Sequence, residues 1–199
     1  MIPANRAVRI RPALIDDALG IARVNVRSWQ GAYRGILPDS FLDALDASTR
    51  EERLKDALRQ QPGEGRFTLV AELSPAADGQ SAEIIGFSSG GPEREGLVLG
   101  EVAFDGEIYA LYLAPEHQRQ GNGRRLIAAS TELLVERGMR SVVIWALKGN
   151  LPARAFYEKM GGVLAGEKHV TIGPSDLLDI AYGWPDAHVL LARAQGASG

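Results

Sequence analysis

The sequence predicts an α/β (α+β) fold in which a mixed β-sheet is covered by helices. A strand–helix–strand–helix–strand order occupies residues 107–184, and the segments before it are themselves rich in strands. The composition is that of an ordinary globular chain, with 45% hydrophobic and 24% charged residues. At 199 residues the chain can bury the core of a single domain, which we place at residues 1–192, with a flexible tail at residues 193–199.

A short strand and two helices are predicted near the N-terminus. Residues 8–11 alternate in polarity as a strand does. Asp16 and Asp17 mark the start of a helix, because acidic groups are favourable at a helix N-terminus. The sequence Ser48-Thr49-Arg50-Glu51 matches a capping box, which predicts another helix that ends near residue 59.

A hairpin is predicted in the next part of the chain. Residues 66–72 and 83–88 have the apolar character of strands, and a polar connection through Ser74-Pro75 and Asp78-Gly79 joins them. The apolar patch at residues 97–104 lies between turn residues and is not assigned to a strand. No repeat or interdomain linker interrupts this order, which agrees with one domain.

Residues 107–130 predict the strand, turn and helix around which the rest of the chain is organised. An apolar run ends at Pro115, and helical periodicity begins after two glycines, Gly121 and Gly123. Glycine lets a backbone approach a ligand closely, and the first N–H groups of a helix have no partners within it. Such a helix start binds phosphate, and the side chains around it supply donors and positive charge: Gln118, Arg119, Arg124 and Arg125.

Two other glycine-rich loops do not fit this turn. A P-loop needs Lys followed by Ser or Thr after its last glycine, and Arg124 and Arg125 stand there. A dinucleotide fingerprint needs a third glycine where Leu126 stands. A solvated turn with two helpful glycines remains the alternative if the motif is taken alone.

The C-terminal part predicts a buried strand, a helix and two further strands. Residues 141–147 form a continuous apolar run, which suits a strand buried on both faces. Asn150 is a predicted N-cap, and the helix after it ends at Gly161-Gly162. Strands are predicted at residues 162–171 and 177–184.

The composition argues against several classes of function. The 22 basic and 25 acidic residues nearly cancel, so no global charge favours nucleic acid or an anionic membrane as a partner. The absence of Cys excludes disulfides, thiolate zinc sites and a cysteine nucleophile, and the three His show no metal-ligand spacing. No signal-peptide core and no bilayer-spanning apolar run is visible, so we expect a soluble cytoplasmic protein without a bound metal.

Two linked motifs carry a resemblance to a known family. The pattern Gln118-x-x-Gly121-x-Gly123 after an apolar strand resembles the acyl-coenzyme A binding motif of the GNAT superfamily of N-acetyltransferases. The segment from Asn150 to Gly161 resembles the second motif of that family, in the expected order and at the expected separation. The resemblance implies a twisted, mostly antiparallel sheet of about seven strands flanked by about four helices. It also implies acetyl-coenzyme A as co-substrate, an amine acceptor, and direct transfer in a ternary complex.

The resemblance implies two catalytic residues. Tyr157 falls at the family's general-acid tyrosine and would protonate the leaving thiolate, although a buried core tyrosine is the alternative. Glu107 falls at the glutamate base of the histone acetyltransferase branch, and an exposed carboxylate at a strand end is the alternative. A base is useful because deprotonating an amine with a pKa near 10.4 at neutral pH costs roughly 4.6 kcal/mol.

Cofactor contacts are expected mainly from the main chain. Pantetheine would lie along Leu111 and Leu113, with the Leu113 N–H polarising the thioester carbonyl, and the pyrophosphate would rest on N–H groups of the glycine-rich turn. The full set of expected cofactor residues is Leu111, Leu113, Gln118, Arg119, Gln120, Gly121, Asn122, Gly123, Arg124 and Asn150.

The acceptor is a small-molecule or peptide amine by the same resemblance. Trp29 and Tyr33 are the candidates for its pocket, although aromatic residues beside a helix end are more often core residues. The acidic residues Asp39, Asp43 and Asp46 suggest either attraction for a cationic amine or a solvated face. A non-catalytic acyl-coenzyme A binder and a protein N-terminal or lysine acetyltransferase stay open as alternatives, as does a homodimer.

Overall fold

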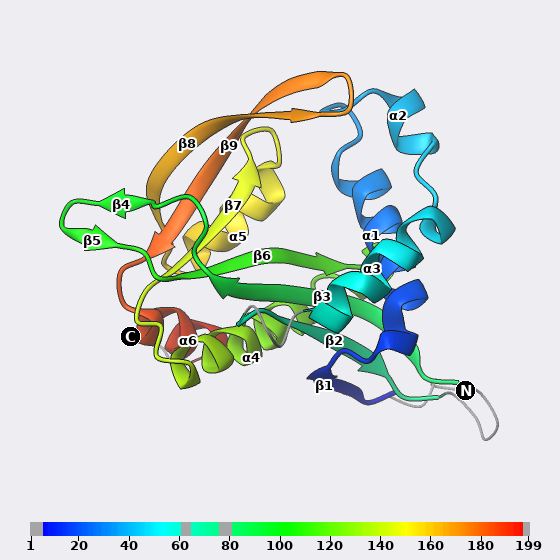
Figure 1. The fold of residues 1–199 in the computed structure, drawn as a ribbon, viewed down its shortest axis with the longest axis horizontal. Helices are drawn as coiled ribbons and strands as arrows, with labels where there is room; N and C mark the ends of the chain where they lie inside the picture. The colour runs from blue at the N-terminus through cyan, green and yellow to red at the C-terminus, as the bar shows by residue number, and fades with distance from the viewer. Residues whose placement is uncertain (1–5, 61–64, 76–80, 197–199) are drawn as a thin grey trace.

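A twisted seven-stranded sheet forms the centre of the computed structural model, which describes residues 6–60, 65–75 and 81–196 (Figure 1). The strand order is β1-β2-β3-β6-β7-β9-β8. The strands are β1 (Val8–Pro12), β2 (Phe67–Leu73), β3 (Glu83–Pro92), β6 (Gly106–Leu113), β7 (Val142–Leu147), β8 (Val163–Ile172) and β9 (Ser175–Trp184). A separate small hairpin pairs β4 (Val98–Leu99) with β5 (Val102–Ala103).

The sheet is mixed, as the sequence predicts. Every neighbouring pair of strands is antiparallel except β6 and β7, which run parallel. The mostly antiparallel sheet of seven strands is therefore confirmed. The strand β7 is apolar along its length because both of its faces are covered. Its residues Val142, Val143 and Ile144 are at most 2% exposed.

The parallel strands β6 and β7 stay together over a short distance and then part. They pair at three positions, the last being Ile108 with Ile144. Beyond that point β6 continues only along β3, up to Leu113, while β7 continues along β9, up to Leu147. Figure 1 shows the two strands diverging. We call the gap beyond the Ile108–Ile144 pair the split.

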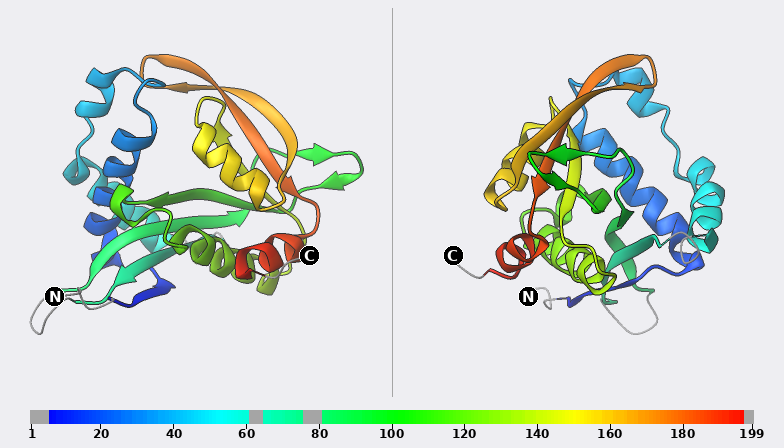
Figure 2. Two further views of the ribbon diagram at one scale, coloured as in Figure 1. Left: turned by 180° about the vertical axis from the view of Figure 1, so that it is seen from behind. Right: turned by 60° about the vertical axis from the view of Figure 1, so that its left-hand side comes forward.

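Helices cover both faces of the sheet (Figure 2). They are α1 (Ala18–Ala32), α2 (Asp39–Asp43), α3 (Ala47–Gln60), α4 (Asn122–Glu136), α5 (Leu151–Lys159) and α6 (Ala187–Gln195), and short 3₁₀ turns lie at Ile15–Asp17 and Pro115–His117. On one face, α4 and α6 bury Leu126, Ile127, Leu134 and Leu190 in the main core. On the opposite face, α1 places Ile21 and Val24 against β2 and β3. Among helices of the described residues, none has the length and apolar character needed to cross a membrane.

The described residues form six α-helices where about four are expected, and the two additions are α2 and α6. The predicted tail is wrong at its start, because α6 continues through Gln195 and Ala194 is only 8% exposed. The Asp186 side chain accepts a hydrogen bond from the His188 N–H, and Gly196 ends the helix with a φ of 87°. Residues 197–199 lie outside the described ranges.

Two smaller expectations also change. The helix α3 begins one residue before the predicted capping box, and its cap is Asp46, whose Oδ2 accepts from the Thr49 N–H at 3.2 Å. The unassigned patch at residues 97–104 forms the β4–β5 hairpin. Asp78 and Gly79, expected in the tip of the β2–β3 hairpin, lie outside the described residues.

Candidate active site

The turn between β6 and α4 has a backbone shaped by two left-handed residues. Gly121 has a φ of 85° and Arg119 a φ of 58°. A Cβ on Gly121 would meet nothing within 4 Å, so the space beside this residue is open. Gly121 is also the N-cap of α4 and supplies no side-chain cap. The first N–H groups of α4 therefore face open space, as an anion site requires.

Side chains of the turn fix its position against the end of β6. Gln118 Nε2 donates to the Leu113 carbonyl at 3.1 Å, and Gln120 Nε2 donates to the Glu116 carbonyl at 2.9 Å. Asn122 is 4% exposed, and its Nδ2 donates to the His117 carbonyl at 3.1 Å. These three predicted cofactor residues thus use their side chains to hold the loop, and the Gln118 N–H also donates within the chain, to the Pro115 carbonyl at 3.3 Å.

The basic residues of the turn do not all remain available. Arg124 Nη2 donates to the Arg193 carbonyl in α6, and Arg125 Nη2 donates to the Val8 carbonyl at 2.6 Å. Arg119 is exposed and makes no hydrogen bond or ion pair within the described ranges. Arg119 is therefore the guanidinium of this turn without a partner in the described residues, while Arg124 ties α4 to α6.

The main chain of β6 presents alternate groups to the split. The Ala114 N–H donates to the Ile85 carbonyl of β3 at 2.9 Å. Because strand residues alternate in the direction of their N–H and C=O groups, Leu111 and Leu113 turn theirs away from β3 and toward the split. The Leu113 carbonyl follows this pattern, since it accepts a hydrogen bond from Ser28 Oγ at 2.8 Å rather than from β3.

The helix α5 brings Asn150 and Tyr157 to the other side of the split. Asn150 Oδ1 accepts from the Ala153 N–H at 3.3 Å, which confirms the predicted N-cap and leaves Nδ2 for another partner. Tyr157 is 5% exposed and packs against Tyr182 and Trp184, with ring centroids 5.8 and 6.5 Å away. Burial, and then the neighbouring Tyr112 phenol, raise the pKa of Tyr157, so its hydroxyl stays protonated at neutral pH.

Glu107 is buried and already has a partner. Its side chain is 1% exposed, so the alternative of an exposed carboxylate at a strand end is wrong. Arg94 Nη2 and Nε donate to its two carboxylate oxygens at 2.5 and 3.0 Å. The Arg94 guanidinium also lies 3.9 Å from the centroid of the Tyr109 ring. The structure thus gives Glu107 a bidentate ion pair that ties β6 to the segment before β4.

Trp29 and Tyr33 meet a third aromatic residue, Tyr112, on the face of the sheet covered by α1. The Trp29 and Tyr33 rings form a T-shaped pair at 5.1 Å, and the Tyr33 and Tyr112 hydroxyls are 3.5 Å apart. Burial first, and then the nearby Tyr112, Tyr157 and Asp179 groups, raise the pKa of Tyr33. Tyr112, Tyr157 and Asp179 therefore interact electrostatically with Tyr33. Sequence reasoning missed Tyr112 and Asp179, because single strand residues carry no local signal.

The acidic residues Asp39, Asp43 and Asp46 are engaged in local structure. Arg34 forms ion pairs with Asp39 at 3.0 Å and with Asp43 at 2.5 Å, and Asp46 caps α3. These partners leave little free negative charge for an acceptor amine at this point of the chain.

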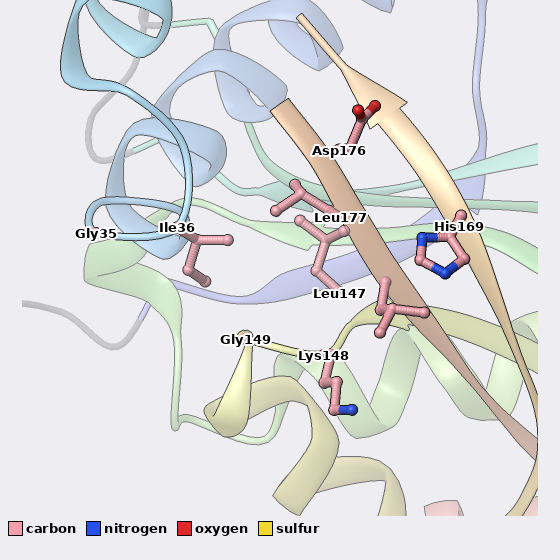
Figure 3. Close-up of a pocket in the computed structure, with 9 residues that line it drawn as sticks. Gly35, Ile36, Leu147, Lys148, Gly149, His169, Asp176 and Leu177 are labelled. Atoms are coloured by element: carbon pink, nitrogen blue, oxygen red, sulfur yellow. The ribbon is translucent and has the colours of Figure 1, made fainter. Parts of the chain in front are cut away.

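A pocket of about 450 Å³ lies beyond the end of β7 (Figure 3). Its apolar wall includes Ile36, Leu147 and Leu177, and the polar side chains around it are Lys148, His169 and Asp176. His169 projects from β8 toward this space in Figure 3. Leu147 lies on β7 beyond its last pairing with β6, so the pocket adjoins the open end of the split.

One group of residues in the described ranges has the spacing of metal ligands, namely Glu83, Glu116 and His117. Both carboxylates are exposed, and Glu116 is paired with Arg27 at 2.6 Å. This arrangement is that of an ordinary charged surface.

Comparison with known proteins agrees with this geometry. A model of the acetyltransferase (GNAT) family matches residues 29–162. The uncharacterized N-acetyltransferase YuaI of Bacillus subtilis strain 168 is 33% identical over 183 residues, covering 92% of this chain and 96% of that protein. The spermidine N(1)-acetyltransferase of Thermoplasma acidophilum is 23% identical over 157 residues, covering 78% of this chain and 88% of that protein.

The fold has close counterparts among solved structures. The PaiA N-acetyltransferase of Thermoplasma acidophilum, solved in complex with coenzyme A, superposes with a TM-score of 0.61 at 22% identity. The match covers 87% of this chain and 98% of that one. The match of the family model over most of the chain and the relative at 33% identity lead to one conclusion: the chain belongs to the GNAT family of acetyltransferases.

Proposed function

We propose that this chain transfers the acetyl group of acetyl-coenzyme A directly to a small primary amine. The observation that carries the proposal is the split between β6 and β7, which begins after Ile108. The uncapped N-terminus of α4 follows the end of β6, and the buried Tyr157 of α5 lies on the other side of the split. In the proposed complex the split would hold the thioester, and the α4 N-terminus beside it would hold the phosphates of coenzyme A.

The residues around the split fit acetyl-coenzyme A as a substrate. The N–H groups of Leu111 and Leu113 would bind pantetheine in the place of a neighbouring strand. The pyrophosphate would meet the N–H groups from Gln118 to Gly123, with open space at Gly121 and the free Arg119 guanidinium beside them. Asn150 would donate its Nδ2, which the helix cap does not use.

The proposed chemistry needs no covalent acyl-enzyme. The thioester supplies an acetyl carbon open to attack by an amine. The amine nitrogen forms a bond to that carbon, the carbon–sulfur bond breaks, and Tyr157 gives its proton to the departing thiolate. A phenol is protonated at neutral pH, so this proton is present when the thiolate forms. The Leu113 N–H would stabilise the negative charge on the carbonyl oxygen.

The surroundings of the split favour a small acceptor over a protein segment. The β8–β9 hairpin arches over the split toward α2 (Figure 1). At its tip, a Cβ on Gly173 would lie 2.4 Å from the Phe41 ring, so the hairpin and α2 are in close contact. Leu42, Leu177 and Ile172 belong to the same apolar cluster. A closed arch admits a small amine, and the relative from Thermoplasma acidophilum is named for spermidine, which is one.

The test is isothermal titration calorimetry of acetyl-coenzyme A into the wild type, Gly121→Trp and Gly138→Trp. Gly138 is the matched control, because it has a φ of 87° at the other end of α4 and an added Cβ there also meets nothing within 4 Å. We expect the wild type and Gly138→Trp to bind and Gly121→Trp to lose binding. Equal binding by all three proteins would remove the proposed cofactor site, and no binding by the wild type would overturn the proposed function.

A further inference from the structure

A half-buried carboxylate on β9 has no partner of its own. Asp179 stands opposite Leu147 of β7 and Lys168 of β8. Within the described residues it makes no hydrogen bond or ion pair, in contrast to Glu107 with its bidentate arginine. The side chain is only partly buried and its oxygens reach solvent, so they are open to a ligand that carries a cation or an N–H donor.

Register places Asp179 on the face of the sheet where an acceptor would approach. Leu177 and Ala181, which flank it at alternate positions on β9, pack with Tyr33 and Trp145 respectively. Because side chains alternate along a strand, Asp179 shares their face. Its charge is among the causes that raise the pKa of Tyr112, after burial. Asp179 therefore lies near the tyrosines that border the split.

A second unpaired polar group lies beside it. Trp145 stands opposite Ala181, which places it diagonal to Asp179 on the same face. Its Nε1 is fully buried and has no acceptor in the described part of the chain.

The charges around Asp179 leave room for a cation. Lys168 is the nearest basic residue, but its Nζ is bound to Glu95 at 2.6 Å and lies over the Trp145 ring at 4.3 Å. Burial raises the pKa of Asp179, and Lys168 opposes this only in part. The remaining groups that interact with the tyrosines are Arg50, over the Trp29 ring at 5.3 Å, and the phenols themselves. A carboxylate with a raised pKa is a better proton acceptor than an ordinary one.

We propose that Asp179 binds the acceptor ammonium group and removes its proton before attack. This inference rests on the proposed function and names its base. The ammonium loses two protons in all: one passes to the Asp179 carboxylate and then to solvent, and the other restores Tyr157 after the phenol has protonated the thiolate. The amine nitrogen forms its bond to the acetyl carbon as the carbon–sulfur bond breaks. Glu107 is then a structural residue in this chain.

The experiment compares kcat/KM of the wild type, Asp179→Asn and Glu167→Gln between pH 6 and pH 10, with n-butylamine and spermidine as acceptors. Glu167 is the matched control, because it is exposed and lies next to Lys168 on the opposite face of β8. Calorimetry of acetyl-coenzyme A and a thermal melt show whether each variant is folded. Asp179→Ser is a second variant for the case in which the amide side chain disturbs the site.

We expect Asp179→Asn to lower kcat/KM at pH 7 by about 100-fold or more, the ordinary effect of a general base. The loss shrinks as the pH approaches the amine pKa, near 10.4, because the free amine then needs no base. A kcat/KM of the Asp179 variants within threefold of the wild-type value at pH 7, or an equal loss of kcat/KM at every pH, would overturn this inference and leave the proposed function standing. A wild type that acetylates neither amine would overturn the inference together with the proposed function.

Discussion

Arg94 holds the Glu107 carboxylate through two parallel hydrogen bonds, Nη2 to Oε1 at 2.5 Å and Nε to Oε2 at 3.0 Å. Charge-assisted bidentate pairs of this kind are stronger than hydrogen bonds between neutral groups. Both carboxylate oxygens already accept from the guanidinium, so an acceptor ammonium would have to displace Arg94 to reach them. Glu107 matches the base of the histone acetyltransferase branch in position, but in this chain it can serve as half of a structural ion pair.

Glu107→Gln tests that role. We expect the free energy of unfolding to fall by about 1–3 kcal/mol, because a charge-assisted bond to a buried group is lost. That change corresponds to a loss in Tm of about 2–4 °C for each kcal/mol in a chain of this size. Urea unfolding and amine acetylation are the measurements, and Glu101→Gln is the exposed control on the same segment. A loss of kcat as large as that of Tyr157→Phe, with stability unchanged, would restore Glu107 as the base.

Tyr157→Phe removes the proposed acid and leaves the ring. We expect kcat to fall by about 100-fold or more while the Kd of acetyl-coenzyme A is unchanged. Tyr182→Phe is the control, because Tyr182 packs against Tyr157 and donates to Glu158 at 2.6 Å, outside the proposed chemistry. Steady-state kinetics and calorimetry measure the two quantities. Full activity of Tyr157→Phe would leave Tyr157 as a core residue.

The cap and the proposed cofactor contact of Asn150 use different atoms, because Oδ1 caps α5 and Nδ2 has no partner in the described residues. Asp retains the capping oxygen and loses the Nδ2 donor, whereas Ala loses both. We expect Asn150→Asp to unfold like the wild type but bind acetyl-coenzyme A more weakly. Asn150→Ala should bind weakly and also lose about 1 kcal/mol of stability. Equal affinity of Asn150→Asp and the wild type would limit Asn150 to its role as a cap.

Acid stability should depend on the Arg11 cluster. Arg11 bonds Asp17 at 2.6 Å and Glu72 at 2.6 Å. Burial alone would raise the pKa of Asp17, but the bonds from Arg11 and the Leu14 N–H outweigh it and hold that pKa below its usual value. Hydrogen bonding to Arg11 likewise lowers the pKa of Glu72.

The lowered pKa values of Asp17 and Glu72 determine how stability changes with pH. A carboxyl whose pKa is lower in the folded state stabilises the fold above its unfolded pKa, about 3.9 for Asp and 4.3 for Glu. That stabilisation is lost as the pH falls through the folded pKa. Urea unfolding between pH 7 and pH 2.5 should show a steeper decline for the wild type than for Asp17→Asn. Parallel declines would show that other groups dominate acid unfolding.

Much of the fold was predictable because its signals are local. The apolar run of β6, the two glycines and the helical periodicity of α4 lie within residues 107–130, and the structure follows them closely. The helix α6 had local signals too, Asp186 at its start and Gly196 at its end, but a short segment near a chain end resembles a frayed tail. The cap of α3 was assigned to Ser48 instead of Asp46 because both residues are good N-caps, two positions apart.

The candidate site was predictable only where main chain and motif define it. The turn from Gln118 to Gly123 and the cap at Asn150 follow from residue type and order. The partner of Glu107 depends on how a weakly patterned hairpin folds back across β6, and no local pattern reveals that. Asp179 interacts electrostatically with Tyr33 and Tyr112. Both tyrosines lie far from Asp179 in sequence and come near it only when the sheet forms, so no local pattern marks Asp179 as a site residue.

Mass spectrometry of a single reaction shows whether the acetyl group passes directly from coenzyme A to the amine. The wild type is mixed with acetyl-coenzyme A labelled in the acetyl group and an excess of spermidine, and the amine and the intact protein are weighed at intervals. We expect labelled N-acetylspermidine to appear, coenzyme A to be released in equal amount, and the protein mass to stay unchanged throughout. A labelled acetyl group on the protein that then passes to the amine, or coenzyme A released without acetylated amine, would contradict the account.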